Sequence, residues 1–479
     1  MKKLFLAFGL FAAVMAMAQN RMTPELLWKL KRVGNIAVSP DGTQVLFSLR
    51  SYDLKANGGS SDLYLIPVEG GEPKQITNRQ GSEFDAQWRP DGQKIGFLAA
   101  GDNGGDIAIF EMNPDGSDLK QISRTPGSIN GFKYFPDGKK VLFVKDVKLN
   151  QVNSNETQAD LPKSNARIID DLMYRHWSSW DQGYRSHIFF GVIENGMMQG
   201  RGVDIMKDQN FDAPTKPFGG MEQIAISPDG NSITYACKKM EGKNYAISTN
   251  TDIFIYNVLM GTTSNLSKKN TGYDLDPAYA ADGKKLAWLS MEQDGFESDK
   301  NDIVVHDYET HLTTNLTAEF DLTVSGFTWD DKGEKIYFKS VKEATYQLFE
   351  YDLKKKKIRQ ITEGIHNYTS IAFAGDKLIG GKQSMNHPTD IYAVDIKSGK
   401  EEQLTDVNKA IYDGLEIGKI EKRWVETTDG KQELVWVIYP PNFDPNKKYP
   451  VYMNVYCGPG HNTVLDSYDG TSYLWHQLL

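Results

Sequence analysis

Cysteine is nearly absent from this chain of 479 residues, which contains only Cys237 and Cys457. Two thiols so far apart in sequence are not the disulfide framework of a small cross-linked fold. The chain also lacks the C-x-x-C and H-E-x-x-H motifs that hold metal ions. We therefore expect both cysteines to be small core residues, and we expect no metal and no other cofactor.

An excess of positive charge is also missing, because the net charge at pH 7 is -9. Nothing in the composition therefore points to nucleic acid as a partner. The one notable basic run, residues 354–357, stands just before "IRQIT" and is typical of a solvated hairpin turn. A hydrophobic fraction of 39% and a charged fraction of 24% indicate an ordinary globular chain.

Long apolar runs are confined to the N-terminus. The first eighteen residues, "MKKLFLAFGLFAAVMAMA", combine two lysines, an apolar core from Leu4 to Val14 and a small-residue cleavage site. The apolar core is short for the roughly 20 residues of a membrane-spanning helix, which favours a signal peptide over a membrane anchor. We expect cleavage after residue 18, no membrane span in the mature chain, and a periplasmic or secreted location.

What the sequence has in abundance is one turn phrase. "SPDG" ends at Gly42, and variants of it end at Gly92, Gly138, Gly230, Gly283 and Gly333, with a weaker "AGDK" over 374–377. Proline presets φ, aspartate bonds to nearby backbone and glycine accepts a positive φ, so the phrase predicts a tight turn. Apolar runs such as "QVLFSL" and "KKVLFVK" follow most of these turns and are typical of strands.

Two further phrases recur with the same period as the turn phrase. Phrases similar to "KQIT" end at Thr77, Ser123, Ser267, Thr317, Thr362 and Thr405, and strand phrases such as "DLYLI" begin at Asp62, Asp106, Asp252, Asp302 and Asp390. Several short strands in each period of about 45 to 50 residues are the signature of a β-propeller. The turn phrases predict a mainly β fold with seven blades, from about residue 25 to about residue 410.

One interval, from Gly138 to Gly230, is twice the usual length and holds either an eighth blade or an insertion. The polar stretch "LNQVNSNETQADLPKSNAR" favours an insertion. The following residues "SNARIIDDLMYRHW" have apolar side chains at helical spacing, with Ser164 as a plausible cap. We therefore predict seven blades over residues 19–410, with a helical insertion near 150–185.

After about residue 410 the repeated turn and strand phrases no longer occur. The phrase "KRWVETTDGKQELVWVIYPPNFDPNKKYPVYMNVYCGPG" indicates two or three strands and their turns, and so predicts that a second domain begins over 411–479. A propeller followed by "YPPNFDPNKKYPVYMNVYCGPG" closely resembles the prolyl oligopeptidase family of serine peptidases, in which a propeller caps an α/β-hydrolase domain. The segments "RIIDDLMYRHW", "YAISTNTDIFIYN", "LSMEQDGFESD" and "KRWVETTDGK" are most similar to its bacterial dipeptidyl-peptidase 5-type members.

The resemblance implies removal of dipeptides from the N-termini of oligopeptides, without a strict demand for proline. It also implies that Tyr456, in the Tyr-x-Gly-Pro corner, donates its hydroxyl to the oxyanion of the tetrahedral intermediate. The alternative is a tyrosine that packs at the end of a strand.

Dipeptidyl peptidases of this family place acidic side chains against the terminal ammonium of the substrate, because a buried cation without a partner is costly. Asp170 and Asp171 in the insertion and Glu297 in "DGFESD" are the candidates. The alternatives are helix-surface pairs of Asp170 with Arg167 and of Asp171 with Arg175, and a simple turn role for Glu297. A further alternative is that another carboxylate of the chain pairs with the terminal ammonium.

The Gly-x-Ser-x-Gly elbow of this family does not occur in the sequence, and His461 and His476 precede any possible nucleophile. We therefore expect the chain to stop early in the hydrolase fold and to be inactive alone. The rival hypothesis is a non-catalytic periplasmic propeller of the TolB type that binds peptides or proteins, although "YPVYMNVYCGPG" argues against it. The sequence does not determine the oligomeric state, and a homodimer is one possibility.

Overall fold

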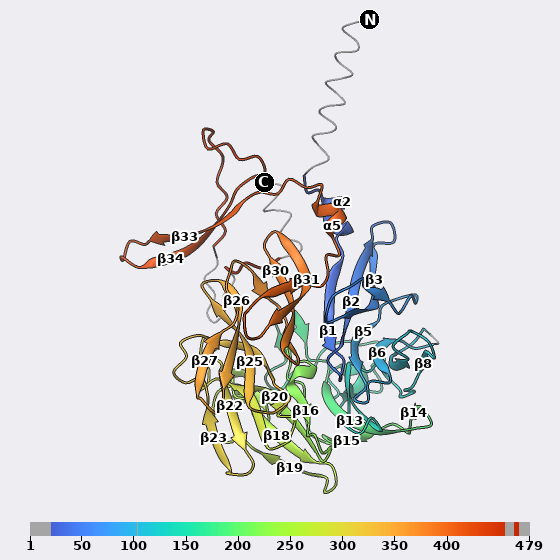
Figure 1. Ribbon diagram of the computed structural model, residues 1–479. Coiled ribbons are helices and arrows are strands. Elements are labelled where there is room, and N and C mark those ends of the chain that lie inside the picture. The colour runs from blue at the N-terminus through green and yellow to red at the C-terminus, as the bar shows by residue number, and fades with distance from the viewer. Residues whose placement is uncertain (1–20, 103, 456–463, 469–479) are drawn as a thin grey trace, which may run out of the picture.

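The computed structural model describes residues 21–102, 104–455 and 464–468. Its strands form seven antiparallel sheets that follow one another around a ring, and two small hairpins lie outside the ring (Figure 1). The predicted mainly β fold with seven blades is confirmed, and the long interval holds one blade with an insertion. Cys237 is fully buried, as predicted for a core residue.

Each blade is formed by strands from one stretch of the chain, and the first strands of most neighbouring blades contact one another around the ring. Blades 1 and 2 consist of β1 (Arg32–Val38), β2 (Gln44–Asp53), β3 (Gly58–Pro67), β4 (Lys74–Gln75), β5 (Phe84–Trp88), β6 (Ile95–Ala100), β7 (Ile107–Met112) and β8 (Lys120–Gln121). Blade 3 consists of β9 (Gly131–Tyr134), β10 (Lys140–Lys148), β13 (Tyr184–Glu194), β14 (Met197–Met198) and β15 (Val203–Asp204).

The remaining blades follow the same order. Blades 4 and 5 consist of β16 (Ile224–Ile226), β17 (Ser232–Cys237), β18 (Asp252–Asn257), β19 (Thr262–Asn265), β20 (Asp274–Tyr279), β21 (Lys285–Ser290), β22 (Asp302–Asp307) and β23 (Leu312–Asn315). Blades 6 and 7 consist of β24 (Val324–Trp329), β25 (Lys335–Lys342), β26 (Thr345–Asp352), β27 (Lys357–Gln360), β28 (Asn367–Tyr368), β29 (Ala372–Ala374), β30 (Lys377–Ser384), β31 (His387–Asp395) and β32 (Glu401–Gln403).

A few short elements lie outside the blades. They are α2 (Pro24–Lys29), α3 (Ser154–Thr157), β11 (Arg175–His176), β12 (Ser179–Trp180), a 3-10 turn at Met221–Gln223, α4 (Gly242–Ile247), α5 (Lys409–Tyr412), β33 (Ile420–Glu426) and β34 (Gln432–Ile438). No helix in the described part of the chain has the length and apolar character needed to cross a bilayer.

The turn phrase forms the connection between the first and second strands of each blade. In blade 1, the Asp41 carboxylate accepts hydrogen bonds from the Ser39 hydroxyl at 2.6 Å and from the backbone N–H of Thr43 at 3.1 Å. Gly42 follows with a φ of 73°, a conformation that side chains with a Cβ rarely adopt. The Asp and Gly of the phrase are therefore both required by the geometry of the turn.

One hydrogen bond, repeated in six blades, explains why the phrases similar to "DLYLI" and "KQIT" recur at a constant distance from each other. A backbone N–H of the third strand donates to a buried Ser or Thr hydroxyl 14 residues later, at 2.8–3.0 Å. The pairs are Leu63–Thr77, Ile109–Ser123, Ile253–Ser267, Ile303–Thr317, Leu348–Thr362 and Ile391–Thr405. We call this contact the inter-strand hydroxyl bond. It satisfies a buried N–H just where the fourth strand ends.

Side-chain packing closes the ring between blades 1 and 7. Phe47 and Ile66 of blade 1 pack in one buried cluster with Ile379 and Ile391 of blade 7. In every sheet among the described residues the strands come from one continuous stretch of chain, so no strand is shared across this closure. Burial of apolar surface, not an exchanged strand, therefore holds the ends of the ring together.

The insertion runs over residues 149–183, between β10 and β13 of blade 3, and the prediction that it is helical is wrong. Residues 164–174 are irregular, and the insertion contains only the single turn α3 and the hairpin β11–β12. The side chains that suggested a helical face, Ile168, Ile169 and Leu172, remain 40–45% exposed. A short helix needs a surface on which to bury its apolar face, and these residues find none.

Because neighbouring strands are antiparallel, all connections between second and third strands lie on one face of the ring, which we call the insertion face. This face carries the insertion and the loops 238–251 and 291–301. The C-terminal segment reaches the same face, since Asp466 accepts from the N–H of Met385 at 2.8 Å and donates its own N–H to Ala344 at 3.0 Å. The hairpin β33–β34 projects from the ring on the side of α2 and α5 (Figure 1).

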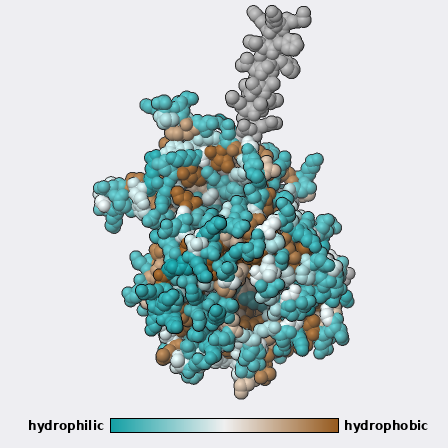
Figure 2. Space-filling model, viewed as in Figure 1, coloured by the Kyte–Doolittle hydropathy of each residue, from teal (hydrophilic) through white to brown (hydrophobic). Residues whose placement is uncertain are grey.

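Hydrophilic side chains cover most of the surface seen in Figure 2, and hydrophobic ones gather toward the end where α2, α5 and β33–β34 lie. The C-terminal segment contributes to the exposed apolar surface, with Val451 87% and Val455 78% exposed.

Candidate functional site

A cavity of about 550 Å³ opens beside the insertion in blade 3. Its wall combines the end of β10, the second half of the insertion, the start of β13 and the loops 210–217 and 240–245. Aromatic side chains form much of the lining, among them Trp180, Phe211 and Tyr245. The cavity thus unites blades 3 and 4 at the insertion face.

Two ion-pair groups fix the polar wall of this cavity. Arg185 makes a two-pronged contact with Asp181, at 3.1 and 3.0 Å to the two carboxylate oxygens. Lys216 lies 3.1 Å from Asp146 and 3.6 Å from Asp212. Arginine that meets a carboxylate through two parallel bonds is held in a defined orientation, so this wall is preorganised.

The charges of the cavity favour a cation over an anion. Burial raises the pKa of Asp212, even though the N–H of Ser186 and the Lys216 ammonium both oppose the rise. Burial also raises the pKa of Tyr245, and the Asp212 carboxylate adds to that rise. The wall of the cavity has four carboxylates, of Asp146, Asp181, Asp212 and Glu241, and three cationic side chains, of Arg175, Arg185 and Lys216, so its charge balance favours a cation.

A second cavity, of about 520 Å³, adjoins the first and shares Phe211, Met240 and Glu241 with it. Glu241 is exposed and belongs to both linings. Within the described parts of the chain its carboxylate has no ion pair with a Lys, Arg or His side chain. It is therefore a carboxylate available to an incoming ammonium group.

Asp171 lies beside the same wall. Its carboxylate accepts from the N–H of Leu172 at 2.8 Å and lies so close to Gly242 that a Cβ there would meet Oδ2 at 2.4 Å. Asp170 is exposed in the same irregular stretch. The helix-surface pairs that were the alternative for these aspartates lose their basis along with the helix.

The two arginines of those alternatives make other contacts. Arg175 donates to the backbone oxygen of Trp177 at 2.6 Å. The guanidinium groups of Arg167 and Arg175 lie 4.8 and 5.2 Å from the ring centre of Trp180. Stacking of this kind stabilises the insertion without a helix.

Glu297 lies in the loop 291–301 between β21 and β22, where it is exposed. Burial lowers the pKa of Lys238, and the carboxylates of Asp294 and Glu297 partly offset that effect. Asp294 lines the second cavity and accepts from the Ser248 hydroxyl at 2.7 Å. Glu297 therefore belongs to the neighbourhood of the second cavity, while Asp171 belongs to the first.

Three sequence-based predictions lie outside the described residues. They are the leader over residues 1–18, the corner at Tyr456 and Cys457, and the positions of His461 and His476. Sequence reasoning in turn missed Glu241 and the Arg185–Asp181 pair. The one available signal for Glu241 was the unusual length of the connection 238–251 between the second and third strands of blade 4.

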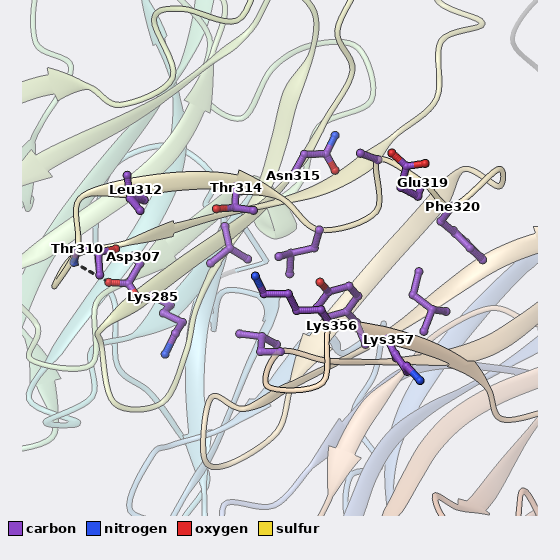
Figure 3. Close-up of a pocket in the computed structure, with 16 residues that line it drawn as sticks. Lys285, Asp307, Thr310, Leu312, Thr314, Asn315, Glu319, Phe320, Lys356 and Lys357 are labelled. Carbon is purple, nitrogen blue, oxygen red and sulfur yellow. Dashed lines mark hydrogen bonds between the residues drawn. The ribbon is translucent and has the colours of Figure 1, made fainter.

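A larger cavity, of about 810 Å³, lies elsewhere (Figure 3). It is a groove between blades 5 and 6, and Thr310 and Lys356 on its wall belong to connections between third and fourth strands. Those connections point away from the insertion face. We therefore place the candidate site at the insertion and not in this groove.

Known proteins are similar to this chain in sequence and in fold. A family model described as the TolB beta propeller domain matches residues 31–193. The chain is 40% identical over 460 residues to a dipeptidyl-peptidase 5 of Porphyromonas gingivalis, which covers 96% of this chain and 66% of that protein. It is 37% identical to a dipeptidyl-peptidase 5 of Porphyromonas endodontalis, over 95% of this chain and 65% of that protein. The chain thus spans slightly less than two thirds of the length of these relatives.

Among solved structures, the acylaminoacyl peptidase of Pyrococcus horikoshii superposes with a TM-score of 0.68. The match covers 88% of this chain and 60% of that one, at 17% sequence identity. At so low an identity the likeness concerns the fold.

Proposed function

The chain belongs to the prolyl oligopeptidase family of peptidases, and on that premise we propose that it is the N-terminal part of an exported serine peptidase that removes dipeptides from oligopeptide N-termini. The observation that carries the proposal is the 40% identity to a dipeptidyl-peptidase 5 over 96% of this chain, because that match includes the insertion and part of the segment after the propeller. The leader over residues 1–18 supports export.

In this proposal the propeller binds the substrate and the chemistry takes place elsewhere. The Gly-x-Ser-x-Gly elbow is absent from these 479 residues, so they should bind a peptide without cleaving it. Tyr456 would donate its hydroxyl to the oxyanion in a form of the protein that includes a complete hydrolase domain. The C-terminal segment docks on the insertion face, through Asp466, which supports a substrate site between that face and the hydrolase domain.

A dipeptidyl peptidase needs a carboxylate at a fixed distance from its nucleophile, to pair with the substrate's terminal ammonium. We propose that this carboxylate is one of Asp170, Asp171, Glu297 and Glu241. Glu241 and Asp171 have the stronger support, because one lines both cavities and the other lies against Gly242 at the wall of the first. The excess of carboxylates in the first cavity favours the same kind of ligand.

The test uses a form of the protein extended through a complete hydrolase domain, with a free-amine peptide and its N-acetylated twin as substrates. Asn or Gln replaces each of the four acidic residues in turn. Loss of a charge-assisted hydrogen bond costs about 1.5–3 kcal/mol, so the true anchor variant should raise KM for the free-amine peptide about 10- to 100-fold. The acetylated peptide should change little.

Glu309→Gln is the matched control, because Glu309 is an exposed acid at a turn on the opposite face, paired with Lys284. If all four variants keep the wild-type preference for the free amine, the anchor is another residue. If the wild-type protein shows no such preference, the proposed dipeptidyl activity itself is wrong.

The rival function is a module that only binds a partner, and the match to the TolB propeller model is compatible with both functions. The protein extended through a hydrolase domain distinguishes the two functions, because a pure binding module would retain the peptide without releasing a product.

A further inference from the structure

Asp390, in the third strand of blade 7, has a buried oxygen without a hydrogen-bond partner in the described part of the chain. Its Oδ1 accepts from the Thr405 hydroxyl at 2.7 Å and from the N–H of Val407 at 3.2 Å. Its Oδ2 has no hydrogen bond with any of the residues that the structure describes, although only 1% of the side chain is exposed. A buried carboxylate oxygen is seldom left in this state, because its lost hydration is not replaced.

Two other blades give the matching aspartate a donor from the fourth strand. In blades 4 and 5 an Asn of that strand donates to a carboxylate oxygen, Asn265 to Asp252 at 2.9 Å and Asn315 to Asp302 at 2.8 Å, and among the described residues Oδ1 of Asp252 still has no partner. In blades 1, 2 and 6 the matching residue is a glutamine that donates to a backbone oxygen. The matching residue of blade 7 is Gln403, and its longer side chain donates instead to the backbone oxygen of Thr405 at 2.8 Å. Oδ2 of Asp390 is left for a different partner.

Two further potential metal ligands surround this oxygen. One nitrogen of His387, one oxygen of Asp390 and one oxygen of Asp406 all lie within 4.8 Å of one another. Nδ1 of His387 lies 3.8 Å from Oδ2 of Asp390, too far for a hydrogen bond, and 2.8 Å from the backbone oxygen of Pro388. His387 is half-buried and Asp406 is exposed, so the group opens to solvent on one side.

We propose that His387, Asp390 and Asp406 bind one divalent transition-metal ion, of the class of Zn²⁺ or Mn²⁺. One imidazole nitrogen and two carboxylate oxygens suit these ions, whereas Ca²⁺ and Mg²⁺ prefer oxygen ligands alone. Two carboxylates neutralise the charge of the ion, and the exposed side leaves room for water as a further ligand. Bonds of about 2.0–2.2 Å require the three groups to draw slightly together, which the exposed Asp406 side chain can do.

The ion would strengthen the closure of the ring. His387 and Asp390 begin β31, while Asp406 lies after the last strand of the propeller. Two residues further on, the Asn408 side chain exchanges two hydrogen bonds with the backbone of Lys31, at 2.8 and 3.0 Å, and so joins the two ends of the propeller. A ligand that binds only the folded state stabilises it by mass action.

The test uses the untagged chain, stripped with a chelator and then titrated with Zn²⁺. Calorimetry gives the affinity, and elemental analysis after dialysis gives the metal content. We expect one tightly bound Zn²⁺ per chain and a higher Tm with the metal. His387→Gln and Asp406→Asn should each weaken this binding at least about tenfold and abolish the gain in Tm.

Gln403→Asn is the most specific variant, because it changes no charge and no proposed ligand. It should supply Oδ2 of Asp390 with the donor found in blades 4 and 5, and so should weaken Zn²⁺ binding while it stabilises the metal-free protein. Asp413→Asn is the control, because Asp413 is an exposed acid nearby that pairs with Lys409 at 2.9 Å. Wild-type affinity in both His387→Gln and Asp406→Asn would overturn the proposal, as would a wild-type chain that retains no Zn²⁺ or prefers Ca²⁺.

Discussion

Replacement of Thr317 by Val tests whether the inter-strand hydroxyl bond stabilises the blades. The Thr317 side chain is fully buried, accepts the N–H of Ile303 at 2.9 Å and donates to the Asp302 carboxylate at 2.8 Å. Valine has nearly the same shape and lacks the hydroxyl. The substitution therefore removes two hydrogen bonds and creates no large cavity.

The structure indicates which of the two losses matters more. Asp302 keeps the Lys300 ammonium at 2.9 Å and the Asn315 amide at 2.8 Å, so its carboxylate remains well partnered. The N–H of Ile303 is left buried without an acceptor, which costs about 1–3 kcal/mol. With an unfolding entropy of about 2.1 cal/mol/K per residue over a propeller of this size, Tm should fall by about 2 °C.

Calorimetry and urea unfolding measure this change. Thr317→Ser keeps the hydroxyl that blades 2 and 4 have naturally as Ser123 and Ser267, so it should lose only the contribution of one methyl group, about 1 kcal/mol or less. Thr314→Val, at an exposed position of the strand β23 that ends two residues before Thr317, should stay within about 0.5 kcal/mol of the wild type. A Thr317→Val protein as stable as Thr314→Val would refute the reasoning.

Three further predictions concern the tail, the oxyanion donor and a buried acid. Limited proteolysis should cut the exposed stretch between residues 419 and 455 and leave a resistant propeller, and equal resistance along the chain would contradict this. In the protein extended through a hydrolase domain, Tyr456→Phe should lower kcat by about 10²-fold with little change in KM; an unchanged kcat would assign Tyr456 to packing. Burial raises the pKa of Glu83 to about 7, above its ordinary value of 4.5, so its contribution to stability is present at low pH and is lost as pH rises from about 4.5 through 7. Glu83→Gln should therefore raise Tm at pH 8 and leave it nearly unchanged at pH 4, and a lower Tm at pH 8 would disprove this.

The sequence was most informative where the chemistry is local. The bonds of Asp41 and the positive φ of Gly42 lie within five residues, so the turn phrase could be recognised directly. The inter-strand hydroxyl bond spans 14 residues, and it appeared in the sequence only as two phrases that keep a constant distance. Repetition in six blades made that longer contact visible.

Features that depend on tertiary context could not be predicted. Residues 164–176 have helical spacing, yet Ile168 and Leu172 have nothing to pack against and the helix does not form. Glu241 became a candidate only when the fold brought its loop beside the insertion of another blade. The partners of Asp390 lie on both sides of it in the sequence, at spacings that match no known metal motif, and only the fold brings them together.

Product analysis by mass spectrometry is the most direct test of the proposed peptidase function. The protein extended through a complete hydrolase domain is incubated with one oligopeptide that has a free N-terminus and with its N-acetylated twin. The proposal predicts that dipeptides leave the free peptide one after another while the acetylated twin stays nearly intact. Release of single residues, cleavage within the peptide, or equal attack on the acetylated twin would contradict it.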